Sequence, residues 1–517
     1  MDYFHSPLSI YTLFQAKNLQ GLGERIISIF EIKYTLFFLD LILIPVIRKL
    51  MNPGERNRRN FKRFIFCLLI GMIIVSIQPL KHYVRFSDPF KQYRGTDHIV
   101  RYSIIGYTIL DLYSFVKENN VKLDDEEIRL IEDWFQEKSS WQTDQEDLFF
   151  GLGTNKNLII IQVESLQSFV INSHIDGQEI TPNINNMLDS SIYFPNIYPQ
   201  TIEGNSSDAE LLTQTSLYPL PKGSVFFRKP NNKYFSLGRL LNEDGYTTMA
   251  IHADEATYWN RDKIYPNLGF ERYYSIEDFT IDEEIGMGLR DISMFTQSME
   301  FLKSSEKPFY SFIITLTNHT PFNLPAEYRE LKLDDELDRS KVGGYLQSVH
   351  YTDKAIGIFM DELKQSGLLE ESIIVIYGDH DGLRDQDRPL IEKFLEKENI
   401  CVNEWIQKYV PIPFIIYIPG INGVTFDTVG GQVDVFPTVK HIMGIEPDRF
   451  QYYLGKNLLL EESGYAIIPQ GEYSTRQTYI VTQDDVDLFP DQKLLRELEI
   501  SNLIISGDYF RFIDDDE

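Results

Sequence analysis

Three short apolar segments of this chain, each rich in β-branched residues, lead into residue types that bind metal ions. Runs of this length and composition are typical of parallel β-strands buried on both faces. In open α/β sheets, ligands bind beyond the carboxyl ends of such strands. The pattern therefore predicts a buried sheet with one convergent metal site at its edge. The segments are 158–163, 309–316 and 372–377, and they lead to Glu164, to His319, and to Asp379 with His380.

From residue 157 onward, strand-like and helix-like segments alternate, which predicts βαβ units around a mostly parallel sheet. The roughly 360 residues of this region can bury the core of a single α/β domain. The stretches 478–482 and 508–512 are expected to form a small antiparallel sheet near the C-terminus. Expected strands are 158–163, 246–251, 309–316, 372–377 and 413–418, and expected helices are 182–190, 207–215, 233–243, 291–303 and 343–366.

Two apolar segments near the N-terminus, 33–50 and 63–80, are close to the ~17-residue minimum for a membrane-spanning helix. The second has no charge after its first residue, whereas the first contains Asp40 and Pro45. A pair of buried core helices is the alternative. The expected domains are a membrane region with two transmembrane helices at 1–82, a helical linker at 83–156 and a catalytic domain at 157–517.

The loop between these apolar segments is strongly basic, and basic loops stay on the cytoplasmic side of a membrane. We therefore expect everything after Leu80 to lie outside the membrane. This orientation also places residue 1 outside. Either the two segments insert together as a hairpin or further transmembrane helices lie upstream of this sequence, and we expect the second. The basic residues are Arg48, Lys49, Arg56, Arg58, Arg59, Lys62 and Arg63.

The formal net charge is −28, and the clustering of basic residues near the apolar segments leaves the outer domain strongly acidic. Nucleic acid is not an expected partner, because phosphate backbones need basic surfaces. The two cysteines are Cys67, within an apolar segment, and Cys401, far along the chain. Neither a disulfide framework nor a cysteine metal site is expected.

Ser206 is the candidate nucleophile. It follows Gly204, and residues 207–210 have the pattern of a capping box that opens a helix. A hydroxyl at a helix N-terminus lies at the positive end of the helix dipole, where a phosphate group is stabilised. A metal ion can activate this hydroxyl by stabilising its alkoxide. The alternative is that Ser206 or Ser207 only caps the helix.

Two groups of residues complete the candidate site. Glu164, Asp379 and His380 offer the ligand types that suit Mn²⁺, Mg²⁺ or Zn²⁺, although any one of them could instead form a structural ion pair. The second group suits an anionic substrate, because arginine grips phosphate oxygens through two nitrogens and an indole N–H is a single donor. Each member alone would more often be a packing or surface residue. The members are His252, Asp254, Trp259, Arg261 and His319.

Together, these motifs resemble those of the lipoteichoic acid synthases, membrane-anchored phosphoglycerol transferases of the alkaline phosphatase and sulfatase superfamily. The resemblance covers nearly the whole outer domain and the two apolar segments before it. It implies a sulfatase-like α/β fold with a mostly parallel sheet flanked by helices. The motifs lie at 163–169, 204–210, 216–226, 259–262, 317–319 and 377–380.

The resemblance implies that Glu164, Ser206, Asp379 and His380 hold a Mn²⁺-type ion, and that the second group surrounds a glycerophosphate. It implies transfer of glycerol phosphate from phosphatidylglycerol to a lipoteichoic acid chain or its glycolipid anchor, through a covalent intermediate on Ser206. Typical synthases of the family have threonine as the nucleophile. The serine therefore leaves open a polymerising synthase, a primase that adds the first unit, or a paralogue.

Other functions also remain open on the sequence alone. One alternative is a related extracellular phosphodiesterase or phosphoethanolamine transferase. Another is a non-catalytic surface protein that binds an anionic polymer on a sulfatase-like scaffold. The formylglycine sulfatase signature is absent around Ser206, which argues against sulfatase chemistry.

Overall fold

The computed structural model divides the chain into two compact units, Met1–Val121 and Lys122–Glu517. No helix in the described part of the chain is long and apolar enough to cross a membrane. The segments expected to span the membrane, 33–50 and 63–80, lie outside the described residues except for Phe66 and Ile70. The structure describes residues 10, 66, 70, 106–109, 111–113, 115–117, 121–139, 149–394, 399–446, 449–461, 463–469, 478–487 and 492–516.

The second unit is built on a mixed, mostly parallel sheet with the strand order β12-β4-β11-β10-β1-β9-β5-β6, and β13 also pairs with β4. β1 lies at the centre and runs parallel to both β10 and β9. Only β11 runs antiparallel to its neighbours β10 and β4. The strands are β1 (Asn157–Val163), β4 (Ser191–Tyr198), β5 (Thr247–Ile251), β6 (Arg272–Tyr274), β9 (Phe309–Ile314), β10 (Ser372–Gly378), β11 (Ile412–Tyr417), β12 (Val424–Thr425) and β13 (Gly430–Gly431).

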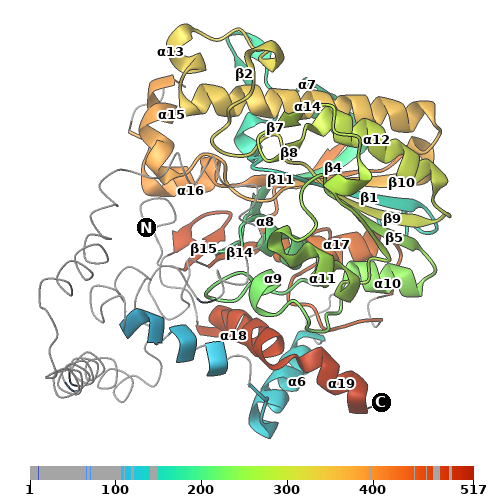
Figure 1. Cartoon of the computed structure of the whole chain (residues 1–517), viewed down its shortest axis with the longest axis vertical. Coiled ribbons are helices and arrows are strands. Elements are labelled where there is room, and N and C mark those ends of the chain that lie inside the picture. The colour runs from blue at the N-terminus through green and yellow to red at the C-terminus, as the bar shows by residue number, and fades with distance from the viewer. Residues whose placement is uncertain are drawn as a thin grey trace, which may run out of the picture. The chain divides into compact units, whose positions relative to one another are not determined.

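Helices cover both faces of this sheet, so its central strands are buried on two sides (Figure 1). Alternate residues of β1 point into two separate cores, with Leu158 and Ile160 in one and Ile159 and Ile161 in the other. This arrangement explains why the strand is an unbroken apolar run. One layer contains α7 (Pro182–Met187), α12 (Asp291–Ser304) and α14 (Lys341–Gln365), and the other contains α8 (Ser206–Thr215), α10 (Leu237–Glu243), α11 (Arg261–Asn267) and α17 (Val435–Ile442).

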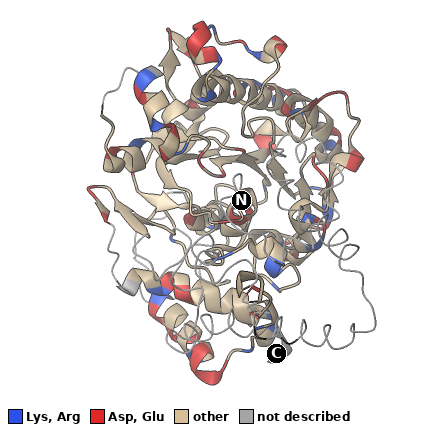
Figure 2. Cartoon of the chain, turned by 60° about the vertical axis from the view of Figure 1, so that its left-hand side comes forward, with Lys and Arg blue, Asp and Glu red and all other residues tan. Residues whose placement is uncertain are grey.

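The first and last long helices of the unit pack against each other. α6 (Asp125–Ser139) contacts α18 (Gln492–Gly507). Trp134 of α6 and Leu498 of α18 both belong to the same core as the central strands. The two ends of the described unit are therefore part of one hydrophobic core. Asp and Glu residues lie mostly on the outer helices and loops (Figure 2).

The C-terminal region confirms one prediction and contradicts another. A three-stranded antiparallel sheet is present, formed by β14 (Tyr465–Ile468), β15 (Tyr479–Thr482) and β16 (Val486–Asp487). The expected strand at 508–512 is wrong, because this segment begins the helix α19 (Tyr509–Asp516). Alternating aromatic residues suited a strand, but Tyr509 and Phe510 bury their rings in the helix-lined core instead.

Candidate active site

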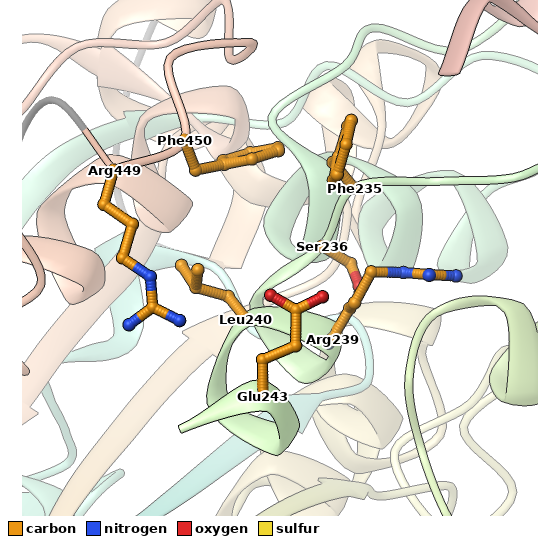
Figure 3. A pocket seen from close by; sticks show the side chains of 7 residues that line it. All are labelled: Phe235, Ser236, Arg239, Leu240, Glu243, Arg449 and Phe450. Atoms are coloured by element: carbon orange, nitrogen blue, oxygen red, sulfur yellow. The ribbon is translucent and has the colours of Figure 1, made fainter. Parts of the chain in front are cut away.

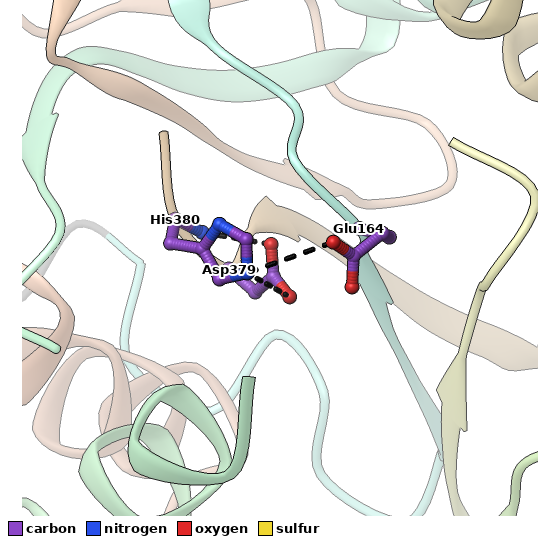
Figure 4. A group of neighbouring side chains, drawn as sticks. All are labelled: Glu164, Asp379 and His380. Atoms are coloured by element: carbon purple, nitrogen blue, oxygen red, sulfur yellow. Dashed lines mark hydrogen bonds and ion pairs between the residues drawn. The ribbon is translucent and has the colours of Figure 1, made fainter. Parts of the chain in front are cut away.

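The sheet register places the two acidic candidates side by side. Val163 is paired with Gly378 across the parallel strands β1 and β10, and Glu164 and Asp379 follow directly on these partners. His380 is the next residue. One potential ligand atom from each of the three side chains lies within 4.8 Å of the others (Figure 4). A buried cluster of this composition suits a divalent metal ion.

One carboxylate oxygen of Asp379 is left without a hydrogen bond in the described part of the chain, although His380 Nε2 lies 3.6 Å from it. The Asp379 side chain is fully buried, and its Oδ1 accepts hydrogen bonds of 2.7 Å from the backbone N–H groups of Ser165 and His380. Its Oδ2 has no hydrogen-bond partner among the described atoms. Burial, reinforced by the charge of Glu164, raises the pKa of Asp379 to about 7. A metal ion would satisfy the orphaned oxygen, so the residues fit a metal site.

Ser206 brings its hydroxyl to this cluster. It is the first residue of α8, and its Oγ donates to Glu164 Oε2 at 3.2 Å and lies 3.4 Å from His380 Nε2. The side chain is half-buried, whereas the rest of the helix is buried. Ser206 therefore has the position expected of a nucleophile that shares the metal site, at the N-terminal end of a helix.

The predicted capping box at residues 207–210 is wrong. Ser207 donates its hydroxyl to the Gly204 carbonyl at 2.8 Å, so it is not the helix cap. Asp208 holds the preceding loop instead, since its Oδ2 accepts from the backbone N–H groups of Ile202 and Gly204 at 2.9 and 2.8 Å. Glu210, the other expected box residue, turns away from the cap toward Arg261. Asp208, a residue of α8, therefore holds the loop before Ser206 in place.

His252 and Asp254 of the proposed substrate group follow β5, next to the metal-binding edge. His252 Nδ1 lies 3.1 Å from the Ile314 carbonyl, which can only accept, so this nitrogen carries the proton. Burial, together with the charge of Arg261, lowers the pKa of His252 well below its usual value. Burial raises the pKa of Asp254, and the Arg261 charge opposes this rise. A neutral imidazole and a carboxylate therefore lie within the electrostatic reach of one arginine.

Trp259 and His319 occupy less buried positions than the other members. Trp259 has a left-handed backbone with φ 57°, and its indole stacks on Phe227 with ring centroids 4.6 Å apart. His319 does not close a strand as expected, because β9 ends at Ile314 and a loop follows. Its imidazole is half-buried, and a positive charge on it would lower the pKa of Asp254, against the larger effect of burial.

Several residues that support the site were not predicted. Gln162 lies within β1, and its amide donates to the Ser206 carbonyl at 3.3 Å and accepts from the Tyr377 hydroxyl at 2.7 Å. A glutamine inside an apolar strand is the signal that could have revealed it. For Glu210, the sequence contained only a weak indication of a role at the site, namely its spacing of four residues from Ser206. Its partner Arg261 lies far away in sequence, and spacing could not connect the two.

A separate cavity of about 140 Å³ lies beside α10 and contains none of the predicted site residues (Figure 3). Two arginines, one glutamate and two aromatic rings contribute to its walls. Arg449 is already paired with Asp244. The cavity is therefore not the centre of the proposed chemistry. Its lining residues are Phe235, Ser236, Arg239, Leu240, Glu243, Arg449 and Phe450.

Comparison with known proteins agrees with this geometry. The sulfatase family model matches residues 156–445, and the model of the lipoteichoic acid synthase N-terminal domain matches residues 2–124. Lipoteichoic acid synthase 2 of Bacillus subtilis (strain 168) is 31% identical over 539 residues, which cover 99% of this chain and 81% of that protein. The chain belongs to the lipoteichoic acid synthase family. As a member of this family it is an enzyme, a transferase.

Two further relatives of this family refine the comparison. The lipoteichoic acid synthase-like YvgJ of Bacillus subtilis (strain 168) is also 31% identical, over 98% of this chain and 84% of that protein. The crystal structure of the lipoteichoic acid synthase LtaP from Listeria monocytogenes is 27% identical, with a TM-score of 0.61 over 70% of this chain and 94% of that chain. The sulfatase-like and alkaline-phosphatase-like fold predicted from the sequence is confirmed.

Proposed function

We propose that this enzyme transfers glycerol phosphate from phosphatidylglycerol to a lipoteichoic acid chain or its glycolipid anchor. The observation that supports this most is the position of the Ser206 hydroxyl, 3.2 Å from Glu164 Oε2 and 3.4 Å from His380 Nε2, at the start of a helix. The names of the relatives agree with this reaction. A synthase, a primase and a paralogue remain equally compatible with the proposal.

Glu164, Ser206, Asp379 and His380 would hold a divalent ion, for which we favour Mn²⁺ over Mg²⁺ or Zn²⁺. When bound, this ion would lower the pKa of the Ser206 hydroxyl and offset charge on the phosphoryl oxygens. Ser165 and His380 orient the Asp379 carboxylate through their backbone N–H groups. This backbone support keeps the second carboxylate oxygen directed at the site.

In the first half of the reaction, the Ser206 hydroxyl releases its proton to solvent and its Oγ forms a bond to the phosphorus of phosphatidylglycerol. The bond between phosphorus and the diacylglycerol oxygen breaks, and this oxygen takes up a proton, for which we assign His319 as the donor. The product is diacylglycerol and a glycerophosphoryl ester on Ser206. The N-terminal end of α8 favours the negative charge that develops on the phosphoryl oxygens.

In the second half, a hydroxyl of the acceptor attacks the same phosphorus. The proton of this hydroxyl passes to His319, which gave up its own in the first half, while the Ser206–phosphorus bond breaks and Ser206 takes up a proton from solvent. His252, Asp254, Trp259 and Arg261 would hold the glycerophosphate through both halves, with the neutral His252 able to accept a hydrogen bond at Nε2. Positioning and charge stabilisation supply most of the catalysis in such phosphoryl transfers.

The donor lipid also defines the location that we propose. The catalytic domain, residues 157–517, would lie on the outer side of the cell membrane, joined to the membrane region at 1–82 by the linker at 83–156. The basic loop between the two apolar segments supports this orientation. The partners of the enzyme would be the membrane lipid donor and the lipid-linked acceptor, and not nucleic acid.

Replacement of the nucleophile tests this proposal. The Ser206→Ala variant of the full chain in lipid vesicles should release no diacylglycerol from head-group-labelled phosphatidylglycerol, while its melting temperature stays near that of the wild type. Ser207→Ala is the matched control, because its hydroxyl bonds to the Gly204 carbonyl and to Ser224 rather than to the metal site. It should retain activity.

Undiminished diacylglycerol release by Ser206→Ala would refute the covalent mechanism. The identity of the transferred group is tested separately by mass spectrometry of the trapped adduct. A mass increase of glycerophosphate on the peptide that contains Ser206 is expected with phosphatidylglycerol. An adduct formed only with phosphatidylethanolamine would instead identify a phosphoethanolamine transferase.

A further inference from the structure

The guanidinium group of Arg261 is buried and only partly used. Arg261 begins α11 and is 2% exposed. Its Nε donates to Glu210 Oε1 and Oε2 at 3.1 and 3.3 Å, and its Nη2 donates to Glu210 Oε1 at 2.5 Å. Its Nη1 has no hydrogen-bond partner in the described part of the chain. A buried N–H without a partner is costly, so this nitrogen is the one that a ligand oxygen would satisfy.

Glu210 is held in place by two residues of the helix α11. It is fully buried on α8, four residues after Ser206 and therefore one turn further along the same face. Its Oε2 also accepts a 2.7 Å hydrogen bond from Tyr265, which lies four residues after Arg261 on α11. Both carboxylate oxygens are thus occupied by α11. Glu210 itself has no direct role left to play on a substrate.

The unpaired nitrogen of Arg261 lies in the neighbourhood of the proposed substrate group. His252 Nε2 lies 3.9 Å from Asp254 Oδ2, and the backbone N–H of Asp262, the residue after Arg261, donates to the Ala256 carbonyl at 3.0 Å, which joins the start of α11 to the loop that follows Asp254. The charge of Arg261 accordingly influences the pKa of both His252 and Asp254. Asp254 Oδ2 is likewise a buried atom without a hydrogen-bond partner among the described residues. An unpaired donor and an unpaired acceptor therefore lie in the same neighbourhood, as a head group with phosphate and hydroxyl groups requires.

We infer that Glu210 is a positioning residue of the transfer reaction, which acts through Arg261 and not on the substrate. The Glu210 carboxylate occupies Nε and Nη2 of Arg261, which leaves Nη1 of the arginine for a substrate oxygen. Because Glu210 and the nucleophile are on one helix, a shift of α8 moves Ser206 and the arginine together. The identity of the substrate in this inference rests on the proposed function, whereas the contact between Glu210 and Arg261 does not depend on it.

The test is a double-mutant cycle on the full chain in lipid vesicles. The kcat and KM of diacylglycerol release from fluorescent phosphatidylglycerol are measured for the wild type, Glu210→Gln, Arg261→Lys and the double variant. Glu210→Gln should lower kcat/KM by about 10- to 100-fold, since small misplacements of a binding group have effects of this size. In the Arg261→Lys background, the same substitution should change kcat/KM less than about twofold. An equal loss in both backgrounds would overturn the inference.

A control separates positioning from a general loss of stability. Asp353 is another buried carboxylate, which accepts from the backbone N–H groups of Asn183 and Ile184. Asp353→Asn should lower the melting temperature while kcat/KM per folded enzyme stays unchanged. If Glu210→Gln does not fold, Tyr265→Phe takes its place in the cycle. It should lower kcat/KM by a smaller factor, and again less in the Arg261→Lys background than in the wild type. A fall in kcat/KM for Asp353→Asn as large as that for Glu210→Gln would count against a specific role.

The cycle has a second readout that needs no substrate. If the wild type does not act on phosphatidylglycerol, the proposed function fails, yet the contact can still be measured by thermal unfolding. The melting-temperature losses of Glu210→Gln and Arg261→Lys should then be clearly less than additive in the double variant, because both remove one interaction. Additive losses would overturn the contact, and with it the positioning role, whatever the substrate.

Discussion

Gly204→Ala tests how the loop before the nucleophile is held. A methyl group at residue 204 would lie 2.0 Å from Asp208 Oδ1 and 2.4 Å from its Cγ, so the carboxylate must move. Gly204 does not have a left-handed φ, and alanine therefore meets no backbone strain there. The clash is with the side chain that accepts hydrogen bonds from the Ile202 and Gly204 N–H groups. We expect both bonds to be lost.

The size of the effect follows from these two bonds. Burial raises the pKa of Asp208 to about 7, so its carboxylate is charged in an assay at about pH 8. Hydrogen bonds to charged groups contribute about 1.5–3 kcal/mol each, so the lower end of the range gives a loss of about 3 kcal/mol. An unfolding entropy of about 2.1 cal/mol/K per residue, over about 400 residues, gives about 0.8 kcal/mol/K. The melting temperature should therefore fall by about 4 °C. Transfer should also fall by about tenfold or more, because the displaced loop leads directly into Ser206.

The assay is thermal unfolding of the full chain, followed by circular dichroism, together with diacylglycerol release. Asp208→Ala provides the decisive background, since it removes both the clash and the two hydrogen bonds. Gly204→Ala should cost less than about 1 kcal/mol in that background. The reasoning is refuted if Gly204→Ala has the same cost with and without the Asp208 carboxylate.

Two other predictions concern metal binding and pH. Chelation with EDTA should stop diacylglycerol release and lower the melting temperature, and Mn²⁺ at 100 times its Kd should restore about 2.7 kcal/mol. Asp379→Asn should lose this response, whereas equal melting temperatures with and without Mn²⁺ would contradict a metal site. Burial lowers the pKa of Lys138 to about 7 against the charges of Glu497 and Asp434. Between pH 7 and 10.5 the unfolded chain therefore binds more protons than the folded chain, and the folded state gains stability as the pH rises. The free energy of unfolding of the wild type in urea should rise with pH relative to that of Lys138→Met. A difference between the two that does not change with pH would argue against this.

Local patterns predicted the sheet and its edge well. The apolar runs at β1 and β10 are buried on both faces, and their identity as strands required no knowledge of distant residues. The positions of Glu164 and Asp379 followed from where these runs ended. Their contact depends on the register between strands more than 200 residues apart, but parallel strands must end at the same edge, which made the cluster predictable.

Features that depend on tertiary contacts were not predicted. β4 was missed because Pro195 interrupts its apolar run, although it pairs with β11, β12 and β13. The capping box failed because Glu210 gains more from a buried arginine than from a free backbone N–H. The helix α19 was taken for a strand because packing of its aromatic residues, rather than local propensity, determines its structure.

The contact between α6 and α18 has a consequence for the order in which this chain can fold. Synthesis proceeds from the N-terminus, so α6 is made early, although its Ile131, Trp134 and Phe135 belong to a core that is completed much later. Its partner α18 is among the last segments to emerge. The apolar face of α6 must therefore wait until nearly the whole unit has been synthesised. A chain that stops before residue 492 would leave this face exposed, a feature that quality-control proteases can recognise.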